Sequence, residues 1–218
     1  MRKTLTAFAI TVAALSAMPA TAAQITNEKS QIEFVTTDNI AALLTELGAQ
    51  QVQAQASGKS KSVTFQDGQI PYSVVLGVCD QGTGANCEAA IMVVIFEGGT
   101  NNYALDSFNT FNKEHPFVSA IKLEENRFAL SRMVVTTGGV SKKNLGVNIA
   151  SFAQGPGALM QYLASQLVAG YQDGRTAAAF QRTSFGAAPL RPVYATPRDL
   201  AQVERALNIP KGSPTLRR

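Results

Sequence analysis

The sequence contains few of the residues that build chemical centres: it has two cysteines, one histidine and no tryptophan among 218 residues. A zinc site needs about four ligands, and Cys79, Cys87 and His115 cannot supply a thiolate and imidazole set of that size. We find no catalytic constellation of the Ser-His-Asp type around the single histidine. We therefore expect neither an enzyme nor a metal or cofactor site.

The sequence also lacks an apolar run of the roughly 20 residues that cross a bilayer. The shorter run Leu5–Ala17 follows two basic residues and precedes Ala20-Thr21-Ala22, which is the order of a secretory signal peptide. We predict that residues 1–23 are a signal peptide cleaved after Ala22 or Ala23. The mature chain would then be periplasmic or secreted and would have no transmembrane segment.

Charge is unevenly distributed along the chain. Residues 24–170 carry 9 Lys and Arg against 12 Asp and Glu, a net charge of −3, whereas residues 171–218 carry 8 against 3, a net charge of +5. A mildly acidic body argues against nucleic-acid binding. We predict a folded domain over residues 24–170 and a largely disordered basic tail over residues 171–218, rich in Pro, Ala, Gly and Arg. The alternative is a tail that contacts anionic envelope surfaces as an adaptor.

Cys79 and Cys87 flank a seven-residue polar loop between two apolar segments. If these segments are adjacent strands, the two Cα atoms come within about 7 Å, and a disulfide can form in an oxidising compartment. A closed ring of nine residues stabilises the fold by about 2.5 kcal/mol in the chain-entropy model. The spacing differs from the C-x-x-C of redox centres, so a structural disulfide is favoured over thiol exchange or metal binding.

Hydrophobic periodicity predicts an α+β two-layer fold, an antiparallel sheet with helices on one side, in the order α-βββ-α-ββ-α. Helices are expected over residues 38–47, 105–115 and 141–167, the last interrupted at Gly155-Pro156-Gly157, with a short helix after Pro197 at 198–207. Strands are expected over residues 50–56, 62–66, 69–78, 87–96, 117–123 and 127–136. The strand at 127–136 shows the alternation Phe128, Leu130, Arg132, Val134, which is typical of a half-buried strand.

Three stretches of the chain resemble the YbjN domain family of bacterial sensory transduction regulators, whose fold is like that of type III secretion chaperones. They are GVCDQGTGANCEAAIMVVIF, SFNTFNKEHPFVSAIKLEENRFALSRMVV and TTGGVSKKNL, and the resemblance covers roughly residues 35–165. The resemblance implies that the protein binds a polypeptide partner non-covalently and that it forms a homodimer. The tail from residue 171 lies outside it.

The family pattern N-x-W-N reads Asn109-Thr-Phe-Asn112 in this chain, so Phe111 replaces the tryptophan, and Phe117 follows in the next strand. We take Asn109, Phe111, Asn112 and Phe117 as candidate partner-binding residues. The alternative for the two asparagines is that they satisfy backbone groups at a helix end. The function expected is that of an exported, non-catalytic module that binds a protein or small partner in envelope stress or sensory regulation. Thiol exchange at Cys79 and Cys87 is the enzymatic alternative.

Overall fold

A computed structural model describes residues 25–57, 60–80, 85–98, 105–124, 126–172 and 191–209. The signal peptide expected at residues 1–23, with its cleavage site at Ala22 or Ala23, lies outside the described residues and stays a prediction. The helices are α1 (Thr37–Glu46), α2 (Leu105–Glu114), α3 (Lys142–Ala153), α4 (Gly155–Gln172) and α6 (Pro197–Ala206). The strands are β1 (Gln31–Ile32), β2 (Gln50–Ser57), β3 (Ser60–Asp67), β4 (Ile70–Gly77), β5 (Ala89–Glu97), β6 (Ser119–Lys122), β7 (Arg127–Val135), β8 (Val140–Ser141) and β9 (Arg191–Val193).

The main sheet is antiparallel and has the strand order β2-β3-β4-β5-β7-β6, with β9 pairing with one end of β5. β5 is the central strand and is buried on both faces, as its continuous apolar run predicts. Ala90, Met92, Val94 and Phe96 enter the larger core cluster on one face. Ile91, Val93 and Ile95 enter a smaller cluster on the other face.

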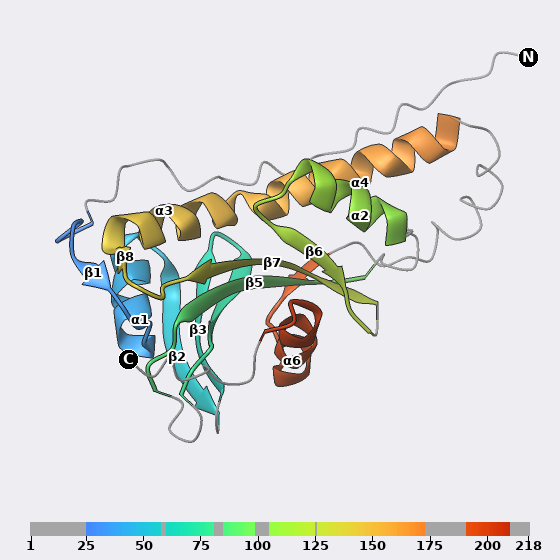
Figure 1. The fold of residues 1–218 in the computed structure, drawn as a ribbon. Coiled ribbons are helices and arrows are strands. Elements are labelled where there is room, and N and C mark those ends of the chain that lie inside the picture. Colours follow the sequence, from blue (N-terminus) through green and yellow to red (C-terminus); the bar gives the residue numbers. More distant parts are fainter. Residues whose placement is uncertain are drawn as a thin grey trace, which may run out of the picture.

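The α+β prediction is confirmed, with two differences in detail. The order α-βββ-α-ββ-α counts three strands between the first two helices, whereas the four ranges expected there, 50–56, 62–66, 69–78 and 87–96, correspond to the four strands β2, β3, β4 and β5. Helices also cover both faces: α1 to α4 contribute to the larger cluster, whereas Val203 of α6 belongs to the smaller one. Figure 1 shows α3 and α4 above the sheet and α6 below it.

The expectation of a largely disordered tail is wrong for residues 191–209. β9 pairs with β5 through Ile95 and Val193, and α6 begins at a capping box in which Thr196 and Asp199 exchange hydrogen bonds. The helix expected at 198–207 is therefore present as α6. Residues 173–190 and 210–218, the rest of the predicted tail, lie outside the described residues.

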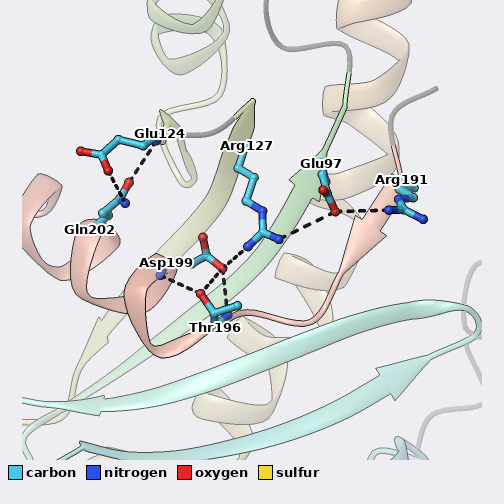
Figure 2. Close-up of polar contacts among 7 residues, drawn as sticks. All are labelled: Glu97, Glu124, Arg127, Arg191, Thr196, Asp199 and Gln202. Atoms are coloured by element: carbon cyan, nitrogen blue, oxygen red, sulfur yellow. Dashed lines mark hydrogen bonds and ion pairs between the residues drawn. The ribbon is translucent and has the colours of Figure 1, made fainter. Parts of the chain in front are cut away.

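An ion-pair network attaches this C-terminal segment to the sheet (Figure 2). Arg127 of β7 lies 2.8 Å from Asp199 and 3.8 Å from Glu97, and Arg191 lies 3.5 Å from the same Glu97 carboxylate. Arg198, which directly precedes Asp199 in α6, donates to Glu124 at 2.7 Å. The tail arginines 191 and 198 are thus paired with acidic side chains of the body.

Cys79 and Cys87 are joined by a disulfide, with their Cα atoms 3.9 Å apart. They lie after β4 and before β5, where the two strands converge. The Val35 amide donates to the Cys87 carbonyl at 2.8 Å, which ties the segment before α1 to the same point. The bridge therefore fixes the strand ends at a junction of three segments.

Candidate binding site at the free edge of β7

The hairpin of β6 and β7 leaves one edge of the sheet partly open. β7 pairs with β5 over its full length, but it pairs with β6 only from Phe128 to Ser131. Figure 1 shows β6 beside the part of β7 next to their shared turn, with β7 continuing past it towards β8. Residues 132–135 therefore form a strand edge that has no neighbouring strand in the described part of the chain.

The direction of the backbone groups along β7 follows from two hydrogen bonds near its ends. The Thr136 amide donates to the carbonyl just before β5 at 2.8 Å, so even-numbered residues of β7 bond to β5. The amide of Leu123, just after β6, donates to the Arg127 carbonyl at 2.9 Å, so odd-numbered residues bond to β6. Because this alternation continues along an antiparallel ladder, the N–H and C=O groups of Met133 and Val135 point past the end of β6.

A hollow of about 390 Å³ lies at this edge, beside the end of β6. The segment before β6 contributes Phe117, β7 contributes Arg132 and Met133, α3 contributes Asn148, and α6 contributes Leu207. The described residues of the lining include no histidine, cysteine or carboxylate. The hollow is thus a mainly uncharged recess bounded by an open strand edge.

Several apolar side chains are exposed around the hollow. Phe117 is 75% exposed, Val135 57% and Met133 43%. Single exposed apolar side chains are common on protein surfaces, but a group of them beside an open strand edge marks an interaction surface. This group is the strongest sign of binding in the described residues.

Arg132 is the one charged residue among the described lining residues. Its guanidinium lies over the Phe117 ring, 5.9 Å from the ring centre, and donates to the side-chain oxygen of Asn148. Asn148 in turn donates to the Asn144 carbonyl at 2.8 Å, which fixes its amide. No carboxylate of the described residues pairs with Arg132, and burial lowers its pKa. A partly buried cation without a counter-ion favours the approach of an anionic group.

The structure separates the four candidate partner-binding residues. Asn109 is exposed on α2, and Phe117 is exposed at the hollow. Phe111 is 0% exposed and belongs to the core. Asn112 is engaged within the fold, since its side-chain amide donates to the Ala120 carbonyl at 3.0 Å and its side-chain oxygen accepts from the Ala120 amide at 2.6 Å. Asn109 and Phe117 are therefore the members of the set that can reach a partner.

Sequence reasoning missed Arg132, Met133, Val135 and Asn148. One signal was present: Arg132 falls in an alternating series whose other members are apolar, which places a charge at an inward position of the strand. The open edge itself was hidden because the strand expected at 117–123 is observed only as Ser119–Lys122. In the observed register, the expected strand 117–123 would face residues 127–133, whereas β6 pairs only with residues 128–131 of β7.

Two further observations concern metal ligands and membrane-spanning helices. The described residues contain no group of three or more His, Cys, Asp or Glu side chains arranged to hold a metal ion. Among the same residues, no helix is both long and apolar enough to cross a membrane.

Comparison with known protein families gives a match over residues 36–156 to the family YbjN, described as "Putative bacterial sensory transduction regulator". The match covers more than half of the 218 residues and extends from the N-cap of α1 into the start of α4. It includes both strands of the open hairpin, whereas β9 and α6 lie beyond it. Neither a curated protein nor a solved structure matches this chain. The extent of the family match shows that the chain belongs to the YbjN family.

Proposed function

We propose that the protein is an exported, non-catalytic YbjN-family module that binds a protein partner in envelope stress or sensory regulation. The observation that carries the proposal is the open edge of β7, with its hollow and its exposed apolar side chains. Folded proteins usually cover, charge or twist away such edges, because a free edge pairs readily with another chain. The regulator description of the family supports a binding role.

The lining of the hollow suits binding better than catalysis. Acid–base or nucleophilic catalysis needs a titratable group within hydrogen-bond reach of the reacting atoms. The described lining offers two serines, Ser119 and Ser131, without a histidine or carboxylate in the same lining. Thiol exchange is disfavoured as well, because Cys87, one half of the disulfide with Cys79, is buried and hard for an attacking thiol to reach.

Two features of the fold support export. A disulfide is typical of proteins that fold in an oxidising compartment. In addition, the residues just after the expected cleavage site belong to the fold: Ile25 packs against Gly146 of α3, and the Thr26 hydroxyl donates to Glu46 at 2.8 Å. Cleavage after Ala22 or Ala23 would leave this docked segment at the start of the mature chain.

The adaptor alternative receives less support. A tail that binds anionic surfaces must present unpaired basic side chains. Of the three arginines in the described tail, two, Arg191 and Arg198, are instead paired with Glu97 and Glu124. We therefore propose a protein partner in preference to a lipid surface.

The proposal is tested by site-specific photo-cross-linking in the bacterial host. The full chain is expressed with a photo-reactive phenylalanine analogue in place of Phe117, and cross-linked products are identified by mass spectrometry. The control carries the analogue in place of Leu105, which is also exposed but lies on α2. We expect one defined protein to cross-link at position 117 and not at position 105; a second copy of the chain as that product would establish the homodimer. The same products at both positions, or none at position 117, would contradict a binding site at the hollow.

A further inference from the structure

We propose that the partner binds as an extended segment that adds to the sheet as an antiparallel strand beside residues 132–135 of β7, in line with β6. The segment carries apolar side chains opposite Val135 and Met133 and a carboxylate opposite Arg132. This inference rests on the proposed function, because it specifies how the same site holds its partner.

The unpaired backbone groups of β7 are the first argument for strand addition. Met133 and Val135 present two N–H and two C=O groups to the open edge, and no strand pairs with them among the described residues. Backbone groups pair best with backbone groups of another extended segment, which is how strand addition obtains its affinity. Arg132 and Val134 already bond to β5 through Met92 and Ala90, so the edge is rigid before the partner arrives.

No residue of β6 pairs with residues 132–135 of β7. In the register of β6 with β7, the residue facing Met133 would be Phe117. However, the Val118 amide donates to the His115 carbonyl at 3.1 Å, so the chain turns before β6 begins. β6 therefore begins only at Ser119, opposite Ser131, which leaves four residues of β7 unpaired on this edge, and the hollow lies at this position.

The register then defines the side chains that suit the site. An antiparallel segment meets Val135, Val134, Met133 and Arg132 in that order. Its first and third residues point to the same face as Val135 and Met133, where Leu207 lines the hollow, so apolar side chains fit there. Its fourth residue points to the face of Arg132, which has no carboxylate partner among the described residues. The matching segment therefore has four residues: an apolar residue at the first and third positions, any residue at the second, and Asp or Glu at the fourth.

A partner segment fits this edge better than a second copy of the chain. Four residues span about 14 Å, and pairing two such edges buries far less than the roughly 800 Å² per partner of a stable interface. A second copy would also bring a second Arg132 and, in its described lining, no carboxylate to neutralise it. An extended acidic segment supplies the counter-ion and needs only the edge and the hollow.

The test uses a phage-displayed library of random nine-residue peptides selected on the full folded chain. We expect the selected peptides to share the four-residue pattern and to lose binding to a Phe117→Ala variant. Synthetic peptides are then N-methylated at one residue at a time. Methylation at either apolar position, whose N–H faces β7, should weaken binding about tenfold or more, whereas methylation at the other two positions should have little effect.

Two measurements on the protein complete the test. Hydrogen exchange followed by NMR should show the Met133 and Val135 amides gaining protection with peptide, while those of Arg132 and Val134 are protected throughout. Met133→Pro, which removes an outward N–H, should weaken binding more than Met133→Ala, which keeps it. Peptides that need Phe117 but tolerate methylation at every position would overturn strand addition and leave the proposed function intact. A library that yields no binder, or only binders indifferent to Phe117, would overturn both.

Discussion

Asn109 and Asn112 lie one turn apart on α2 and have different surroundings. Asn109 is exposed, whereas both polar atoms of the Asn112 side chain bond to the backbone of Ala120 in β6. Asn112 thus occupies the place that a neighbouring strand would take on the outer edge of β6. That edge is capped by a side chain, while the adjacent edge of β7 is left open.

Replacing Asn112 by Ala should lower the free energy of unfolding by about 2 kcal/mol, because it leaves the buried N–H and C=O of Ala120 without their partner. Asn109→Ala should change it by less than about 0.5 kcal/mol, since an exposed side chain is removed. Urea titration followed by circular dichroism measures both. Equal effects of the two substitutions would show that the Asn112 contacts do not hold β6.

The Glu46 carboxylate makes the free energy of unfolding depend on pH, with a stabilisation that is lost at low pH. It accepts hydrogen bonds from Lys142 at 2.6 Å and from the Thr26 hydroxyl at 2.8 Å, and these bonds lower its pKa below the usual value. The stabilisation is therefore present above the unfolded-state pKa, near 4.5, and is lost as the pH falls through the lower folded-state pKa. The contribution is small because the pair is partly solvated.

We expect Glu46→Gln to be less stable than the natural chain at pH 7 by no more than about 1 kcal/mol. The difference should shrink between about pH 5 and pH 3, where the natural carboxylate becomes protonated. Urea unfolding of both proteins at a series of pH values measures it. A difference that stays constant over this range would mean that the Glu46 charge does not contribute.

At the scale of elements, α6 is held to the sheet by one buried charge and one exposed charge. Asp199 has 6% side-chain exposure and binds Arg127, and it also accepts hydrogen bonds from Thr196 at the helix start. The pair of Arg198 and Glu124 is more than half exposed at both side chains. Figure 2 shows Arg127 of β7 beside Asp199, and Glu124, in the turn between β6 and β7, beside Gln202 of α6.

Asp199→Ala should lower the free energy of unfolding by about 2 to 4 kcal/mol, because it removes the side chain that bonds back to Thr196 in the capping box and the nearest counter-ion of Arg127. Arg198→Ala on the same helix should cost less than about 1 kcal/mol, as exposed pairs do. Thermal unfolding of the two variants against the natural chain makes the comparison. If Arg198→Ala were as costly as Asp199→Ala, burial would not be what sets the strength of this attachment.

Elements with a strong local pattern were predictable from the sequence. The spacing of Ile40, Leu43 and Leu44 marks α1, and Asp67-Gly68 marks the turn from β3 to β4, where Gly68 has a φ of 60°. β9 could not be predicted, because a three-residue strand containing Pro192 has no periodicity and depends on β5 for its conformation. Its pairing joins positions almost a hundred residues apart, which local patterns do not report.

The candidate site was only partly predictable for a related reason. Phe117 was identified from its family pattern, and it does line the hollow. Phe111 followed from the same pattern but is a core residue, because helix spacing places it beside Phe108 and away from solvent. The open edge depends on the difference in length between β6 and β7. The turn at residues 115–118 causes this difference in length, and the hydrophobic periodicity of the sequence does not predict it.

At the scale of the whole molecule, the core extends beyond the part that defines the family. The family match ends at residue 156, yet Leu159 and Leu163 of α4 and Val203 of α6 are buried in the two core clusters. Without α6, the apolar side chains of β4 and β5 on that face would be exposed. The C-terminal segment is therefore part of the folding unit.

A chain ended after residue 172 should lose more than about 3 kcal/mol of unfolding free energy, because it lacks the buried Val203 and the partner of Arg127. Val75, Ile91 and Val93 would then lie on an uncovered apolar face, so the shortened chain should bind a hydrophobic dye and self-associate. A chain ended after residue 209 keeps β9 and α6 and is the matched control, expected to lie within about 0.5 kcal/mol of the full chain. Urea titration, dye fluorescence and light scattering measure the three properties. Should the chain ended at 172 match the control in all of them, the family region would be a complete domain, and α6 would be an accessory bound to its surface.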